Sequence, residues 1–133
     1  MYTWVLPAHS FLRWLIVILA LVIAVKFALG WLRGSQFKGI DRGLVAALSG
    51  LLDLQATLGI ILLVGLGLSG EGFPTIRFAH AAAMFIALVL AHLPACWKKA
   101  ADQVRFRNTL FCILGALLPI YVGVMLLPVG WSW

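Results

Sequence analysis

The chain has 133 residues, of which 64% are hydrophobic and only 11% are charged, and its mean hydropathy is +1.09. A water-soluble domain of this length cannot hide so much apolar surface, because a small fold leaves much of its chain at the boundary with solvent. The net charge of +6 would suggest a nucleic-acid partner in a soluble protein. Here the basic residues flank hydrophobic stretches and act as topology signals, so no nucleic-acid partner is expected.

The first apolar stretch covers residues 8–31 and is long enough to be a transmembrane helix, which needs about 20 apolar residues. It has no charged segment before it and no small-residue cleavage motif after it, and it is too long for the core of a signal peptide. We therefore expect a retained span. It carries three ionisable side chains, His9, Arg13 and Lys26.

A second span is predicted for residues 44–69, and it contains Asp53 and Gln55 near its beginning. The segment 70–74 that follows is rich in glycine and ends in Pro74, which is suited to opening the next helix. The two spans and the turn predict a helical hairpin.

The third and fourth spans are predicted for residues 75–97 and 108–127. Pro94 and Pro119 should kink these two helices, because each proline removes a backbone hydrogen bond. Cys96 and Cys112 are too few and too apolar in setting for a disulfide framework or a zinc site, so we expect them to be packing residues.

Short connections between the spans predict one domain over residues 1–133, an all-α membrane protein built as an up-down bundle of four transmembrane helices. The first and third loops carry the basic residues, so both termini should be periplasmic in a multi-pass protein of the bacterial inner (cytoplasmic) membrane. Tryptophans should mark the two interfaces, because an indole ring combines an apolar body with one donor. They are Trp4, Trp131 and Trp133 outside, and Trp31 and Trp97 inside.

An outer cluster of ionisable side chains is expected at the start of the first and third spans, which run in the same direction. His9 and Arg13 share one helix face, as do Arg77 and His80, and Met84 lies one turn below His80. Two histidines at one depth on different helices are what bis-imidazole ligation of a haem iron requires. Arg13 and Arg77 would then face haem propionates, since arginine matches a carboxylate with its planar donors.

Each residue of this cluster also has a structural explanation. A histidine near the end of a span can be an interfacial residue bonded to a backbone carbonyl. The arginines can extend to lipid phosphates, and Met84 can be a core residue. These alternatives stay open from the sequence.

An inner cluster is expected to contain Lys26, Asp53, Gln55 and His92. One interpretation is a structural contact in which Asp53 is paired or hydrogen-bonded, with Lys26 or His92 as its partner; a buried ion pair with Lys26 would fix the register of the helices. The other is a quinone site, in which Asp53, Gln55 and His92 hydrogen-bond the head group and carry its protons.

Several short motifs resemble small four-helix bacterial membrane proteins classed as cytochrome b. The run His9-Ser10-Phe11-Leu12-Arg13-Trp14 opens the first span in the same way, and the positions of Gln55, Gly59, His80, Met84 and His92 are similar in order and spacing. The resemblance implies haem b bound inside the bundle. It leaves the electron donor and acceptor open.

Other classes of function are compatible with the same sequence. The chain could be a non-catalytic accessory subunit of a larger respiratory or photosynthetic complex, or, after oligomerisation, part of a transporter. The chain has almost no mass outside the spans. We therefore expect as partners membrane lipid, and other membrane redox subunits or a periplasmic electron carrier. A homo-oligomer is also compatible with the sequence.

Overall fold

The computed structural model describes residues 2–131, and this part of the chain is helical, without strands. Four of its helical segments are long and apolar enough to cross a membrane. The helices are α1 (Tyr2–Arg33), α2 (Gly39–Leu66), α3 (Thr75–His92) and α4 (Asp102–Met125), with a π-helical turn η1 (Gly67–Glu71) after α2 and a 3-10 turn η2 (Leu93–Trp97) after α3.

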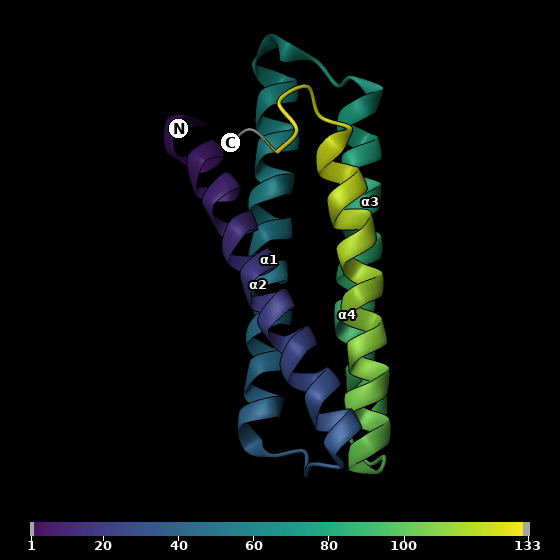
Figure 1. The fold of residues 1–133 in the computed structure, drawn as a ribbon. Helices are drawn as coiled ribbons and strands as arrows, with labels where there is room; N and C mark the ends of the chain where they lie inside the picture. Colours follow the sequence, from purple (N-terminus) through teal and green to yellow (C-terminus); the bar gives the residue numbers. More distant parts are fainter. Residues whose placement is uncertain (1, 132–133) are drawn as a thin grey trace.

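The four long helices form an up-down bundle, as predicted. Each one packs on its neighbours in the order α1, α2, α3, α4 and back to α1, so α1 and α3 occupy opposite corners. Figure 1 shows the start of α1, the α2–α3 turn and the segment after α4 at one end of the bundle, which we call the terminal end. The other end holds the α1–α2 and α3–α4 loops with their lysines and arginines, and we call it the basic end.

Helices α1, α2 and α4 begin before the predicted spans, whereas α3 begins where its span was predicted. α1 begins six residues before the predicted span, and α2 begins five residues before its own. A helix keeps its backbone hydrogen bonds beyond the hydrocarbon core, so an apolar window marks only its central part. Near Pro94 the α-helical bonding of α3 ends at His92 and a 3-10 turn follows, so the helix ends there and is not merely kinked. α4, in contrast, continues through Pro119.

The core lies mainly between α1 and α4. Phe27 and Phe106 are almost fully buried, and their rings meet edge to face with centroids 5.2 Å apart near the basic end. Within the most apolar window of each helix, 33% of α1 and 44% of α4 is buried, but only 11% of α2 and of α3. Helices α2 and α3 therefore bury a smaller share of their residues than α1 and α4 do.

Of the two partners expected for Asp53, Lys26 is wrong and His92 is confirmed. Lys26 pairs instead with Asp41, a buried carboxylate at the start of α2 that also accepts a hydrogen bond from the backbone N–H of Lys38 at 2.8 Å. Asp53 is twelve residues farther along α2, about 18 Å of helix rise, and is out of reach. The pair closes the α1–α2 connection at the basic end.

The tryptophans lie near both ends, but not all of them form a simple belt. Trp4 is 63% exposed at the terminal end, as expected for an interfacial residue. Trp131 folds back onto α1, where its ring meets Trp14 with centroids 5.3 Å apart. At the basic end, Trp31 packs against Phe111 of α4. Trp133 lies outside the described residues.

Candidate cofactor site

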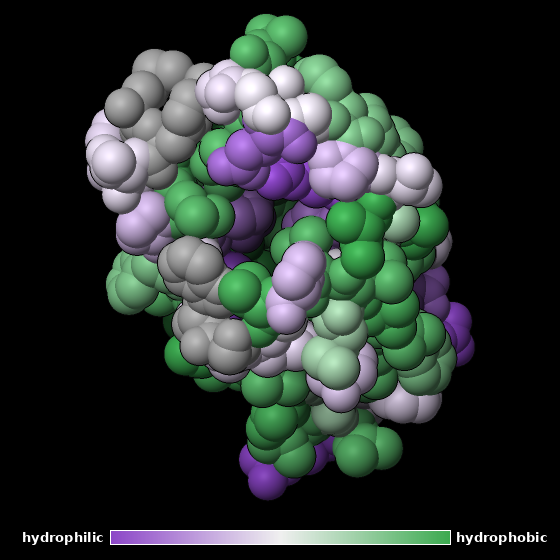
Figure 2. Space-filling model, turned by 90° about the horizontal axis from the view of Figure 1, so that it is seen from above, coloured by the Kyte–Doolittle hydropathy of each residue, from purple (hydrophilic) through white to green (hydrophobic). Residues whose placement is uncertain are grey.

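A cavity of about 350 Å³ opens at the terminal end of the bundle. All four helices contribute to its wall, and the segment after α4 contributes Leu127, Pro128, Val129 and Gly130. Viewed onto this end in Figure 2, hydrophilic side chains gather around a hollow in an otherwise largely hydrophobic surface. The volume falls at the lower end of the range of small-molecule sites, about 300–1,000 Å³.

His9 enters this cavity from α1 and rests against α2. A Cβ atom on Gly59 would lie only 3.3 Å from His9 Cε1, so the glycine provides the space for the imidazole ring. The backbone carbonyl of His9 accepts a hydrogen bond from Gln55 Nε2 at 3.0 Å. His9 Nδ1 is buried, and no described residue gives it a hydrogen bond.

His80 lines the same cavity from α3. Its Nδ1 lies 2.8 Å from the backbone oxygen of Gly123 on α4. A carbonyl oxygen only accepts, so Nδ1 carries the hydrogen, and in the neutral ring Nε2 keeps the free electron pair. A Cβ on Gly123 would come within 2.9 Å of Ala83 Cβ, so glycine here permits the close approach of α3 and α4.

Arg13 lies in the cavity wall one turn after His9. Its guanidinium carbon stands 5.2 Å from the ring centroid of Trp14 and 5.1 Å from that of Trp131. Cation–π contacts on these two rings hold the cation in place and tie the segment after α4 to α1. The charge is thereby positioned at the terminal end of the bundle.

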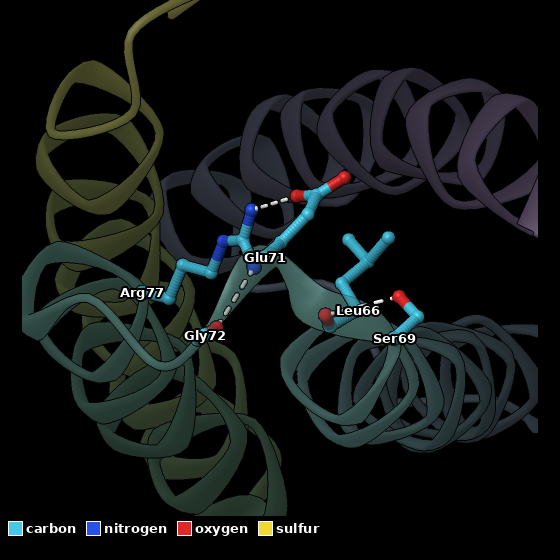
Figure 3. A network of polar contacts seen from close by, with 5 residues as sticks. All are labelled: Leu66, Ser69, Glu71, Gly72 and Arg77. Carbon is cyan, nitrogen blue, oxygen red and sulfur yellow. Dashed lines mark hydrogen bonds and ion pairs between the residues drawn. The ribbon is translucent and has the colours of Figure 1, made fainter.

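Arg77 also lines the cavity, but it has an internal partner that the sequence analysis did not anticipate. It forms an ion pair with Glu71, and its Nη1 donates to the Gly72 carbonyl at 3.4 Å. Figure 3 shows the guanidinium turned toward the end of η1, next to the bond between Ser69 and the Leu66 carbonyl. Glu71 lines the cavity too, so an acid accompanies the two arginines.

Met84 and Gln55 complete the set of predicted residues at the cavity. Met84 lies one turn after His80, as predicted. Gln55 was assigned to the inner cluster, and this was wrong: it is 9% exposed, bonds His9, and leaves its own Oε1 without a hydrogen bond among the described residues. Its amide therefore belongs to the histidine cavity.

The other members of the inner cluster lie elsewhere. His92 Nε2 and Asp53 Oδ1 are 2.8 Å apart, and both side chains are about half exposed on the outer surface of α2 and α3. The three residues expected to surround one quinone head group are therefore divided between two sites. Asp53 and Gln55 are two positions apart on α2, and such residues do not face the same way.

Two residues that hold the cavity side chains in place were not predicted from the sequence. Glu71 stands six residues before Arg77, across a glycine-rich turn, which is compatible with a local ion pair. Gly123 gave no signal, because its role is to offer a backbone oxygen to a histidine 43 residues away. Neither residue type by itself indicates a ligand site.

No family model, curated protein or solved structure matches this chain. Among residues 2–131, no group of three or more His, Cys, Asp or Glu side chains could hold a bare metal ion. Two histidines on one cavity are sufficient only for a metal that brings its other ligands with it, as haem iron does.

Proposed function

We propose that this chain is a haem b-binding electron-transfer protein of the bacterial cytoplasmic membrane, with His9 and His80 as the axial ligands of one haem. The observation that carries the proposal is the cavity at the terminal end, which both histidines line. They come from α1 and α3, at opposite corners of the bundle, so they reach it from two sides. Axial ligation of a flat macrocycle needs this arrangement.

The hydrogen bond of His80 supports a ligand role. A metal-binding histidine commonly donates its second N–H to a carbonyl or carboxylate, which fixes the tautomer and the ring orientation. His80 does so through Nδ1 to Gly123, which leaves Nε2 available as a ligand. The buried and unpartnered Nδ1 of His9 is a second imidazole nitrogen that the described residues leave unused.

The rest of the wall suits a haem held without covalent attachment. No CxxCH motif occurs in the sequence, so thioether bonds are not expected. Arg13 and Arg77 would hold the propionates, and Met84 would pack against the macrocycle. A haem with two imidazole ligands supplies one-electron transfer without an open position for oxygen.

The orientation in the membrane is part of the same proposal. The lysines and arginines of the basic end favour the cytoplasm, so the terminal end and its cavity would face the periplasm. Electrons would then pass to or from another membrane redox subunit or a periplasmic electron carrier, because the described chain adds almost no mass outside its helices. A quinone remains a suitable partner in the lipid, although not at a site built from Asp53, Gln55 and His92 together.

Histidine variants test the ligand assignment. His9→Ala and His80→Ala should each abolish the low-spin haem spectrum or convert it to a high-spin one, because each removes one axial nitrogen. His92→Ala, a matched change outside the cavity, should leave the spectrum unchanged. Loss of haem only in the His92 variant would reverse the assignment. A well-folded wild type without haem would instead favour the accessory-subunit function.

A further inference from the structure

The Asp53–His92 pair occupies an unusual place for ionisable groups in an apolar helical bundle. The side chains of Asp53 and His92 are 55% and 49% exposed, although both lie within the candidate membrane spans. His92 is 17 residues after Thr75, about 26 Å of rise, which puts the pair in the inner part of a hydrocarbon core about 30 Å thick. Ionisable groups at that depth normally face protein or a water-filled cavity, and not lipid.

Part of the surface around the pair differs from a lipid-facing one. From the start of α2 to one turn past Asp53, the exposed positions that share its face follow steps of three and four residues and are small or polar: Gly43, Ala46, Gly50 and Thr57. Farther along α2 the same face exposes Ile61 and Val64, and α3 exposes Phe85 and Val89 on the face of His92. The exposed face of α1, in contrast to the stretch from Gly43 to Thr57, carries large apolar side chains: Phe11, Leu15, Ile18, Val22, Val25 and Leu29. Small residues let another helix approach closely in a membrane.

We infer that this face, formed by α2 and α3 around Asp53 and His92, binds a second copy of the same chain in a two-fold symmetric dimer. Both copies insert in the same direction, so the axis runs parallel to the helices and residues at equal depth meet. Rotation by 180° about that axis places α2 of one copy opposite α3 of the other. Asp53 of each copy then faces His92 of its counterpart.

The free hydrogen-bonding atoms of the pair make this contact self-complementary. The bond within one chain uses His92 Nε2 and Asp53 Oδ1. His92 Nδ1 and Asp53 Oδ2 have no further hydrogen bond to described residues. In the dimer each Nδ1–H donates to Oδ2 of the other copy, which closes a hydrogen-bonded ring of two carboxyl and two imidazole side chains. In a two-fold interface each such contact occurs twice.

The test measures the mass of the full chain in lipid nanodiscs or a mild detergent, with the wild type expected at twice 14.5 kDa. Gly50→Leu should weaken self-association at least tenfold, because it blocks close approach, and it should not disturb the monomer, since a Cβ there meets no atom within 4 Å. The double variant Asp53→Leu with His92→Leu should also be monomeric. Val22→Phe, on the exposed face of α1, is the control and should remain dimeric.

A wild type that is monomeric in nanodiscs would overturn the inference. The same holds if the monomer proves to have a small molecule or another protein bound over the Asp53–His92 pair. A dimer that survives both the Gly50 and the Asp53–His92 variants would overturn it as well, because its interface would lie elsewhere. The helical content of each variant, measured by circular dichroism, separates dissociation from unfolding. The outcome is independent of haem, since neither the measured mass nor the variants involve the histidine cavity.

Discussion

The position of the His9 ring depends on the absence of a side chain at Gly59. Gly59→Ala would place a Cβ 3.3 Å from His9 Cε1, so the ring would have to move by a few tenths of an ångström. Overpacking of this kind costs about 1 kcal/mol or more, and we expect haem to dissociate roughly fivefold faster from the variant. Gly50→Ala is the control, because its Cβ meets open space. Haem release measured by transfer to apomyoglobin gives the comparison, and equal rates would argue against His9 as a ligand.

At the scale of residues, the sequence predicted which side chains line the cavity better than it predicted which residues they contact. His9, Arg13, Arg77, His80 and Met84 were expected together, and all line one cavity. The placement of Gln55 beside Asp53 failed because depth was considered without helical phase. At 3.6 residues per turn, two positions correspond to about 200°, so one side chain enters the bundle and the other leaves it. That distinction was available from the sequence.

The ion pairs were less predictable from sequence. The sequence predicted Asp53 as the partner of Lys26, and the actual pairing with Asp41 depends on where α2 begins. Apolar composition predicts the middle of a span well, but it predicts the residues at which the helix begins and ends poorly. The partner of Arg77 depends likewise on the conformation of the turn that brings Glu71 back toward α3.

Among the elements, the π-helical turn η1 controls the shape of the terminal end. Gly67 begins it, and a Cβ there would overlap the ring of Phe73, which lies directly against the glycine. Gly70 and Gly72 have φ of 106° and 69°, values that favour glycine. These backbone angles return the chain from α2 to α3 and bring Glu71 to Arg77.

Gly67→Ala should therefore displace Phe73 and loosen this turn. We expect it to lower the free energy of unfolding by about 1–3 kcal/mol, the usual cost of overpacking. Gly115→Ala in α4 is the matched control, because its Cβ would stand 3.6 Å from Leu90, an ordinary contact, and alanine favours the helix. Unfolding by denaturant in a fixed detergent would compare the two. Equal stability of both variants would contradict the packing described at η1.

The whole molecule is a ring of four antiparallel helices, and its two ends differ in charge and chemistry. The basic end is closed by the Lys26–Asp41 pair and the contact between Phe27 and Phe106, and the terminal end holds the cavity. Length, hydrophobicity and short connections were sufficient to predict this architecture. The lower burial of α2 and α3 was not predictable, because apolar spans do not reveal which faces they bury.

The proposed topology is tested by reporter fusions. A reporter that is active only outside the cytoplasm should work when fused after Trp133, and a cytoplasmic reporter should work when inserted in the α3–α4 loop. The physical reason is the retention of lysine and arginine loops on the cytoplasmic side. The reverse pattern would move the histidine cavity to the cytoplasmic face and exclude a periplasmic electron carrier.

The central claim is that a haem sits between His9 and His80, and the optical spectrum of the purified wild type tests it most directly. The protein should be expressed in haem-sufficient cells and its spectrum recorded oxidised and after reduction by dithionite. We predict a low-spin b-type spectrum, with a sharp α band on reduction and one haem per chain. A folded, helical wild type that carries no haem and binds none when haem is added would contradict the account.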